Sequence, residues 1–494
     1  MVKSFKNMEE VSLRKIKKER EKKIEILKEK KIDPFPEFSR KIFSIEEILK
    51  NFSKLEKEKR MVSCAGRIFA KREMGRICFL DLKQSHFKIQ VLLKKDQLKD
   101  FSFWHKNLDL GDIIFCEGKV FKTKTKEKTL LALKIQLLSK SLLPLPKEWY
   151  GLKDIEERFR KRYLDLLLNK EVYEKFILKS KIISFIREYF LKNDFLEVET
   201  PILQPIPGGA FAMPFKTFHQ ALKLNLYLRI APELYLKRLI VGGYQKIFEI
   251  GKCFRNEGID STHNPEFLML EAYWSYANYL DFMNFLEKLL KDLLKEIFKT
   301  KKIKYQNYLL DFSKKFKRID IVKKVKEDSG IDFESDSDKE ILKKIKKLKI
   351  EINKKLPPRY LFDFVFKKVS LPKIIQPTFV ILHPKNISPL AKRNPKNSLR
   401  ASRFQLVIAG MEVANGYSEE NDPFEQKKAF LEQQKLLKVD KEVQRYDPDF
   451  LEALSYGMPP TTGLGIGLER LTMILTNASN IREIIFFPLL KPKS

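Results

Sequence analysis

Residues 246–273 combine several side chains that could act together on a nucleotide and a charged substrate. Two strand-like stretches flank a polar turn, which predicts a β-hairpin. The hairpin carries an arginine that suits phosphate, carboxylates that suit ammonium groups, and a histidine and an aromatic ring that suit a base. These residues are Arg255, Glu257, His263, Phe267, Glu271 and Tyr273.

A second block, residues 463–470, is rich in glycine and ends in Arg470. Its three glycines alternate with period two, so in a strand they face one side and leave a bare backbone surface on which adenine can lie. Apolar residues at helical spacing follow and place Arg470 at the start of a helix. A dinucleotide-binding loop starting at Gly463 would need glycine where Leu468 stands, and no Walker A pattern occurs, so both of those readings fail.

Together these blocks resemble motifs 2 and 3 of the class II aminoacyl-tRNA synthetases, and the surrounding residues resemble the bacterial lysyl enzymes of subclass IIb. The resemblance covers about residues 10–490 and includes strings such as Arg162-Tyr-Leu-Asp-Leu. It implies an α+β fold, with an antiparallel sheet flanked by helices and an N-terminal all-β OB-fold barrel. It also implies an enzyme that activates L-lysine with ATP to lysyl-adenylate, releases pyrophosphate and transfers lysyl to the 3′ end of tRNA(Lys).

In that reaction the lysine carboxylate attacks the α-phosphate of ATP, so two anions must be brought together. A guanidinium can bridge both through paired hydrogen bonds, and no general base is needed because the carboxylate is already ionised. The resemblance gives this catalytic role to Arg255, while Arg470 would hold the γ-phosphate or stack on adenine. The other residues that it implies around ATP are Glu257, His263, Asn264, Phe267, Glu412, Gly465 and Gly467.

The acidic residues indicate which amino acid is used. Four glutamates are too many for a pocket that recognises an acidic or amide side chain, and they suit a ligand with two ammonium groups. The four are Glu233, Glu271, Glu412 and Glu419. The resemblance places Glu233 on the α-amino group and Glu419 on the ε-ammonium. The lysine site that it implies consists of Gly209, Glu233, Glu271, Tyr273, Asn415, Tyr417 and Glu419.

The chain departs from the family pattern at two positions. The family usually has two acids, seven residues apart, that bind Mg²⁺ with ATP; here the second is Glu412 but the first position holds Gln405. An amide oxygen can still ligate a hard cation, although it gives up one charge. We therefore expect a greater need for Mg²⁺ or fewer bound ions. Met213 stands where a basic residue usually precedes Pro-Phe, which removes one expected contact to phosphate or to the loop.

Composition sets broader limits. The 494 residues suffice for two or three domains, and the net charge of +33 favours a polyanionic partner, although an AT-rich genome would also enrich lysine. The four cysteines show no zinc-ligand spacing and indicate reduced core residues. Because no signal core and no long apolar run occur, we expect a cytoplasmic protein that does not span a membrane.

Residues 55–140 contain five short alternating runs separated by glycines, which predicts a small closed barrel such as an OB-fold. In the lysyl family this barrel reads the anticodon, here expected to be UUU. A phenylalanine can stack an unpaired uracil, and glutamine and glutamate can pair with its edge. The anticodon residues that the resemblance implies are Lys71, Arg72, Phe79, Gln90 and Glu127.

We expect three segments along the chain: a basic helical extension at 1–54, the anticodon-binding barrel at 55–147 and the catalytic domain at 148–494. The catalytic domain would carry a small helical insertion at about 296–360. The extension has a thin apolar stripe, and it either packs on the body or adds nonspecific affinity for tRNA. Residues 189–203 resemble motif 1, which builds the dimer interface in class II enzymes and implies a homodimer.

Two alternatives remain beside the lysyl enzyme. An aspartyl or asparaginyl enzyme shares the plan of barrel and sheet, but the acid-rich pocket argues against it. A non-catalytic tRNA-binding or regulatory descendant would account for Gln405, but the retained Arg255 and Arg470 argue against it. Lysine-dependent pyrophosphate exchange separates these readings.

Overall fold

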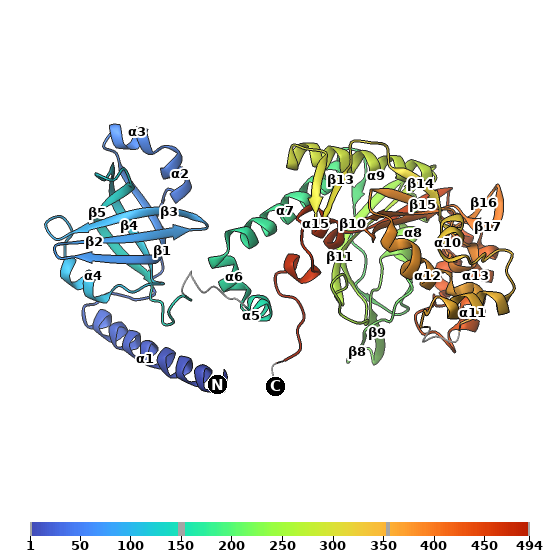
Figure 1. The fold of residues 1–494 in the computed structure, drawn as a ribbon, viewed down its shortest axis with the longest axis horizontal. Coiled ribbons are helices and arrows are strands. Elements are labelled where there is room, and N and C mark those ends of the chain that lie inside the picture. Colours follow the sequence, from blue (N-terminus) through green and yellow to red (C-terminus); the bar gives the residue numbers. More distant parts are fainter. Residues whose placement is uncertain (1, 147–153, 352–355, 493–494) are drawn as a thin grey trace. The chain divides into compact units, whose positions relative to one another are not determined.

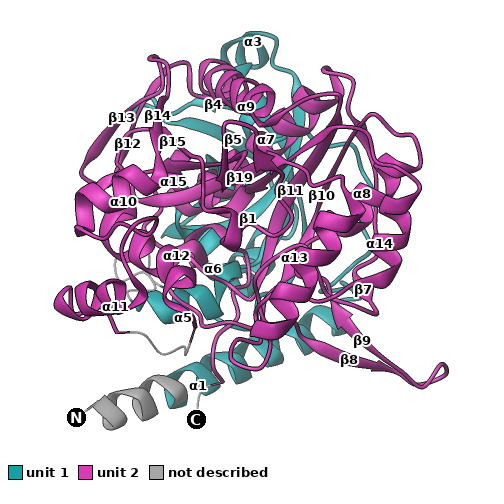
Figure 2. Cartoon of the chain, turned by 90° about the vertical axis from the view of Figure 1, so that its right-hand side faces the viewer, with its two compact units in different colours: residues 1–170 teal, residues 171–494 magenta. Residues whose placement is uncertain are grey.

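The chain forms two compact units, residues 1–170 and 171–494, which Figure 2 shows in different colours. The computed structural model describes residues 2–146, 154–351 and 356–492. The division into three segments stays a prediction, and its boundary at 147/148 lies outside the described residues. Across the described part of the chain, no helix is long and apolar enough to span a bilayer.

A closed five-stranded barrel forms the centre of unit 1 (Figure 1), in the order β1-β2-β3-β5-β4. Its strands are β1 (Met61–Met74), β2 (Ile77–Gln84), β3 (Phe87–Lys94), β4 (Ile113–Lys122) and β5 (Lys128–Ser139). Alternate residues point inward, so that Cys64, Cys78 and Cys116 lie in the barrel core as free thiols. Cys253 in unit 2 is likewise free and buried. The expected barrel and the expected buried, unpaired cysteines are confirmed.

Helices accompany the barrel in unit 1. They are α1 (Val2–Glu29), α2 (Ile45–Lys50), α3 (Phe52–Lys57), α4 (Phe101–Asn107), α5 (Ile155–Arg160) and α6 (Arg162–Leu168). Leu27 of α1 belongs to the barrel core, and Arg20 donates to the carbonyl oxygen of Ser141 at 2.8 Å. Val11 and Leu13 are exposed. The C-terminal half of α1 therefore packs on the body, which is the first of its two expected roles.

Unit 2 is built on an eight-stranded sheet in the order β14-β15-β18-β19-β20-β11-β10-β6. These strands are β6 (Leu196–Glu197), β10 (Lys246–Phe254), β11 (Glu266–Ser275), β14 (Lys317–Asp320), β15 (Thr378–Ile381), β18 (Arg403–Ile408), β19 (Met411–Ser418) and β20 (Thr461–Gly467). The two edge pairs are parallel and the five inner pairs are antiparallel. The expected antiparallel sheet is confirmed.

Helices α7 (Lys170–Leu191), α9 (Tyr279–Leu293) and α15 (Leu468–Leu475) contribute to the main core of unit 2. Leu270, Ala272 and Ile466 point into this core from neighbouring strands and meet Phe190 and Leu286 of the helices. Because side chains alternate along a strand, the residues between them point to the opposite face of the sheet. That second face carries the polar residues of the candidate site.

A second apolar cluster joins α8 (Glu233–Val241), α13 (Pro423–Leu436) and α14 (Pro448–Ser455). Leu234, Phe430 and Phe450 come from these helices, and Tyr273 of β11 joins them. The helices are thereby fixed to the polar face of the sheet. Two smaller sheets complete this part: β7 (Leu203–Gln204), β8 (Lys216–His219) and β9 (Leu224–Leu228), and β16 (Arg393–Asn394) with β17 (Asn397–Ala401).

The segment 296–360 is not purely helical, contrary to expectation. It holds the hairpin of β12 (Lys302–Tyr305) and β13 (Tyr308–Asp311) and the edge strand β14, before α10 (Ile321–Ser329) and α11 (Asp338–Lys347). Ile303, Tyr305 and Leu310 bury in the core, and each of the two strands is only four residues long, within a stretch rich in lysine. Helix α12 (Phe362–Val365) follows, and 3₁₀ or π turns lie at Leu294–Phe298, Pro358–Leu361, Phe366–Ser370, Leu371–Lys373, Lys385–Ile387 and Ile481–Ile484.

Candidate active site

Strand register brings the residues predicted for the amino acid together on the polar face of the unit 2 sheet. Strand β20 lies between β11 and β19 and presents its glycines to both neighbours. Paired residues of adjacent strands direct their side chains to the same face. The pairs are Gly465 with Glu271 and Asn415, and Gly463 with Tyr273 and Tyr417. These four side chains therefore surround the bare strand.

Three carboxylates are almost fully buried here: Glu233, Glu271 and Glu419 are 4%, 6% and 1% exposed. The Tyr417 hydroxyl donates to Oε1 of Glu233 at 2.6 Å, and the Tyr273 hydroxyl donates to Oε2 of Glu271 at 3.1 Å. Among the described residues, Oε1 of Glu419 has no hydrogen-bond partner. A buried carboxylate oxygen without a donor indicates a site for a cation from outside the chain.

The protonation of these carboxyls depends on nearby cations. Burial, reinforced by the charge of Glu233, raises the pKa of Glu271 to about 8. Burial also raises the pKa of Glu419 well above its usual range, although Lys237 opposes this shift. A ligand carrying ammonium groups would favour the ionised forms and lower both pKa values. The pocket therefore suits a ligand with more than one ammonium group.

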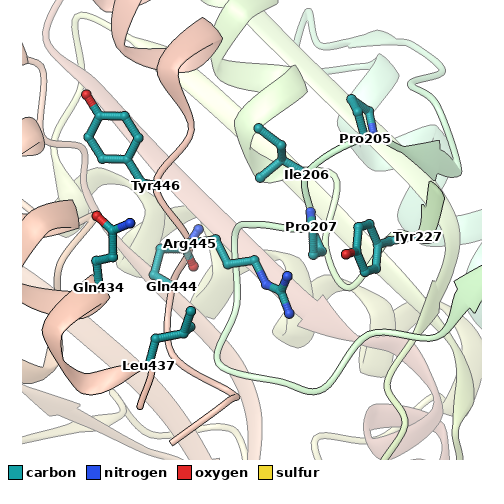
Figure 3. Close-up of a pocket in the computed structure, with 9 residues that line it drawn as sticks. All are labelled: Pro205, Ile206, Pro207, Tyr227, Gln434, Leu437, Gln444, Arg445 and Tyr446. Atoms are coloured by element: carbon teal, nitrogen blue, oxygen red, sulfur yellow. The ribbon is translucent and has the colours of Figure 1, made fainter. Parts of the chain in front are cut away.

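The loop at Gly209 is fitted closely against Glu233. Gly209 has a φ of +87°, and a Cβ there would lie 2.8 Å from the Cβ of Glu233, so the position requires glycine. Gln444 holds this loop by accepting from the Gly209 N–H at 2.8 Å and donating to the Ala210 carbonyl at 3.3 Å. Figure 3 shows Gln444 beside a cavity of about 300 Å³. The other residues that line this cavity are Pro205, Ile206, Pro207, Tyr227, Gln434, Leu437, Arg445 and Tyr446.

Sequence reasoning missed Lys237, which is fully buried on α8. Its ammonium donates to Oε1 of Glu233 at 2.5 Å and forms an ion pair with Oε2 of Glu419. The available signal was the spacing of four residues from Glu233. Such a spacing ordinarily indicates an exposed ion pair on one helix, and it cannot reveal a second partner from a distant strand.

Arg255 follows β10 and is poised to receive an anion. Its guanidinium carbon lies 5.0 Å from the centre of the Phe267 ring. Its Nε is buried and has no hydrogen-bond partner within the described part of the chain. The charge of Arg255 acts on Glu271 and on Arg470, so Arg255 lies near both the carboxylate pocket and the second arginine.

Arg470, on the first turn of α15, is held by protein partners. It donates to the Glu412 carbonyl at 3.1 Å, and its Nη2 lies 2.7 Å from Nε2 of His263. His263 is fixed in turn by Asp260, 2.8 Å from its Nδ1. Burial lowers the pKa of Arg470. The structure thus brings Arg470, His263 and Glu412 together, as predicted for one site.

The remaining residues predicted for ATP lie around the same groups. Asn264 is buried with its Oδ1 unpartnered among the described residues, and the charge of Glu257 acts on Arg470. A Cβ added at Gly465 or Gly467 would meet no atom closer than 3.7 Å. Packing within the chain therefore does not require glycine at these two positions, which fits a flat ligand lying on the strand.

Gln405 and Glu412, predicted to bind a metal, contact each other. Nε2 of Gln405 donates to Oε2 of Glu412 at 2.8 Å, and Oε1 of Gln405 lies 3.1 Å from Nε2 of His383. Burial, with the nearby charge of Arg403, lowers the pKa of His383 to about 3, so its ring is neutral. Across the described residues, no cluster of three His, Cys, Asp or Glu could hold a metal ion. The pair therefore fits a cation in part. Glu412 offers a carboxylate, whereas Gln405 would offer an oxygen only after its side-chain amide rotates to exchange the positions of Oε1 and Nε2.

Four of the five predicted anticodon residues share the outer face of the barrel in unit 1. Arg72 of β1 pairs with Phe79 of β2, and Gln90 of β3 pairs with the residue two positions after Phe79. Gln90 accepts from the Thr129 hydroxyl at 2.9 Å. Glu127 is exposed two residues before Thr129. This face presents an aromatic ring, a cation and two side chains able to pair with a base.

Lys71 does not join these residues. It pairs in register with Leu80, whose side chain lies in the barrel core, so it points to the other face from Arg72. Its ammonium donates to the carbonyls of His105 and Leu108 and pairs with Glu73 at 2.8 Å. Lys71 is thus engaged in holding α4.

Comparison with known proteins agrees with this geometry. The family described as tRNA synthetases class II (D, K and N) matches residues 154–491, and the OB-fold nucleic acid binding domain matches residues 62–138. The lysine–tRNA ligase of Aquifex aeolicus (strain VF5) is 49% identical over 439 residues, 88% of this chain and 74% of the relative. Those of Pelotomaculum thermopropionicum and Carboxydothermus hydrogenoformans are 45% and 44% identical over 489 residues, 98% of this chain and 96% and 100% of the relatives. With the family model spanning most of the chain and relatives this similar over nearly its full length, the chain belongs to the lysine–tRNA ligases of the class II tRNA synthetase family.

Proposed function

We propose that this chain activates L-lysine with ATP to lysyl-adenylate, releases pyrophosphate, and transfers the lysyl group to the 3′ end of tRNA(Lys). The observation that supports this most directly is a group of three buried carboxylates, one of which, Glu271, lies within the electrostatic reach of Arg255. The carboxylates suit a ligand with two ammonium groups, and the arginine suits its carboxylate and a phosphate. One site can therefore hold both reactants of the first step.

In the first step an oxygen of the lysine carboxylate attacks the α-phosphorus of ATP. The bond from that phosphorus to the bridging oxygen breaks, and pyrophosphate leaves with the electron pair. Arg255 would bridge the two anions and stabilise charge on the phosphorus oxygens, while Arg470 would hold the leaving phosphates. In the second step the 3′-hydroxyl of the terminal ribose attacks the lysyl carbonyl and AMP leaves.

Selection of lysine would rest on the buried carboxylates. Glu233 and the backbone at Gly209 would receive the α-ammonium, Glu419 and Tyr273 the ε-ammonium, and Tyr417 would pack on the aliphatic stem. Leucine and methionine leave a buried carboxylate without its cation, which costs roughly 3–5 kcal/mol. Aspartate would add a like charge to an already acidic pocket.

Mg²⁺, bound with ATP at Glu412, would neutralise phosphate charge. We expect Gln405→Glu to lower the Mg²⁺ concentration for half-maximal exchange several-fold, because a carboxylate adds a charge to a site for a hard cation. Exchange rates across a Mg²⁺ titration measure this, and the unfolding temperature across the same titration gives a readout free of catalysis. Gln97→Glu adds the same charge at an exposed position of unit 1 and serves as the control. Equal Mg²⁺ dependence of wild type and Gln405→Glu would contradict the expectation.

Recognition of tRNA would use the outer face of the barrel. We expect Phe79→Ala to raise the KM for tRNA(Lys) in aminoacylation about tenfold or more, because stacking of one base contributes about 1–3 kcal/mol. Exchange without tRNA should not change. Phe87→Ala removes an exposed phenylalanine elsewhere in the same barrel and should leave both reactions intact. An equal loss in the two variants would point to barrel stability in place of base stacking.

We also propose that the enzyme is a cytoplasmic homodimer. Residues 189–203, which resemble the dimer-forming motif, run from the end of α7 through β6. Leu191 and Leu196 in this stretch are exposed large apolar side chains on the single chain. A partner subunit would cover them.

ATP–pyrophosphate exchange without tRNA tests the proposed function, with lysine, ornithine, aspartate and asparagine compared across a Mg²⁺ titration. We expect lysine to support exchange, ornithine to do so less well, and the two others not to do so. A folded protein that binds tRNA(Lys) but exchanges with none of them would be a regulatory descendant.

A further inference from the structure

The amino-acid pocket holds more carboxyl groups than the chain supplies cations for. Three carboxylates, Glu233, Glu271 and Glu419, face one buried ammonium, that of Lys237. In the proposed function, L-lysine brings two ammonium groups, and its carboxylate is directed to Arg255. Three negative charges are then matched by three positive ones, one supplied by the chain and two by the substrate.

We infer that Lys237 is a positioning residue that acts as a built-in counter-ion between Glu233 and Glu419 and holds the two carboxyl groups correctly spaced for the two ammonium groups of the substrate. This inference rests on the proposed function. It assigns to Lys237 no contact with the reacting atoms.

The geometry places Lys237 as a bridge between two elements. Glu233 opens α8 and Glu419 follows β19, so one ammonium in contact with both fixes the distance from the helix to the sheet. The rings of Tyr417 and Phe450 lie 5.6 and 5.8 Å from the ammonium. Lys237 is fully buried, so water cannot replace this charge.

Without the Lys237 ammonium, the surrounding charged groups would destabilise two ionised carboxylates at this place. Burial pulls the pKa of Lys237 down, but Glu233 and Glu419 outweigh burial and keep its pKa above the ordinary value. The other titratable groups whose charges act within this cluster are Glu271 and Tyr273 on β11, Tyr417 on β19 and Arg403 on β18. Lys237 opposes the rise in the pKa of Glu419, so its removal would raise that pKa further and favour the protonated carboxyl.

Lys237→Met tests this inference because methionine keeps an unbranched stem and removes the charge. We expect the KM for lysine at pH 7 to rise at least about 100-fold. The proton on Glu419 must leave when lysine binds, so the KM should fall as the pH rises from 6 to 8.5, more steeply than in wild type. The KM for ATP should not change. Lys237→Arg keeps a permanent charge and should keep the wild-type pH slope even if affinity falls.

Lys291→Met is the matched control. Lys291 pairs with Glu287 at the same spacing of four residues, at 2.6 Å, on α9. The Lys291→Met substitution should alter thermal stability without changing the KM for lysine or the dependence of that KM on pH. If Lys237→Met does not fold, Lys237→Met combined with Glu419→Gln removes a carboxylate with the cation and should fold, with a KM that varies with pH no more steeply than in wild type.

The possible results separate the two claims. Wild-type protein without lysine-dependent exchange would overturn the proposed function, and the role of Lys237 with it. Wild-type exchange together with an unchanged KM and pH slope in Lys237→Met would overturn the role of Lys237 alone. Suppose instead that the KM for lysine rises equally in Lys237→Met and Lys237→Arg and does not depend on pH in either, or that the double variant does not fold. Either result would show that Lys237 acts through its shape.

Discussion

Arg255→Lys will lower the rate constant of lysine-dependent pyrophosphate exchange by about 10²–10³-fold at saturating substrates, the loss typical of removing one donor that stabilises developing charge. The substituted side chain at position 255 keeps the positive charge, but its ammonium cannot bridge a carboxylate and a phosphate through a planar pair of hydrogen bonds. It also gives up the stacking of the guanidinium on Phe267, now 5.0 Å from the ring centre. Initial exchange rates at varied lysine and ATP measure the change.

Arg318→Lys provides the control for this substitution. Arg318 lies on the edge strand β14 and donates to the side-chain oxygen of Asn284 at 2.8 Å. Its replacement should leave the exchange kinetics as in wild type. If Arg255→Lys raised the KM for ATP and left the rate constant intact, Arg255 would bind ground state and transition state equally, and its proposed role would be wrong.

The sequence predicts the fold where local patterns are clean. Alternation of apolar residues gave the barrel strands, and the period of the glycines gave β20. The pattern failed at 302–311, where two strands of only four residues form a hairpin inside an expected helical segment. Core contacts made over long sequence separation decided that segment, and no local signal records them.

The candidate site was predictable in its members but not in their pairing. Glu271 and Asn415 meet at Gly465 because β11 and β19 both pair with β20, and no local pattern in the sequence records this strand order. The ion pair of Lys237 with Glu419 and the contact of Gln405 with His383 depend on elements far apart in the chain. Lys71 was misleading for a related reason, since only the register of β1 with β2 shows that it points away from Arg72.

Glu419→Gln should raise the KM for lysine by about 10²–10³-fold and change the rate constant at saturating lysine far less. Glutamine keeps the shape of the side chain but cannot pair with an ammonium, and an uncompensated buried charge costs roughly 3–5 kcal/mol. The same change should weaken discrimination against methionine and leucine, because the carboxylate that rejects them is gone. Exchange with lysine, methionine and leucine at matched concentrations measures both effects.

Glu420→Gln is the closest control that the chain offers. Glu420 is the next residue and is equally buried, but its oxygens lie 3.6 Å from the ammonium groups of Lys385 and Lys392, outside the pocket. Its replacement should lower the unfolding temperature and leave the KM for lysine unchanged. If both variants raised that KM equally, the effect would come from disturbed packing at the end of β19. A rise confined to Glu419→Gln would instead tie lysine recognition to the carboxylate whose oxygen faces the pocket without a protein partner.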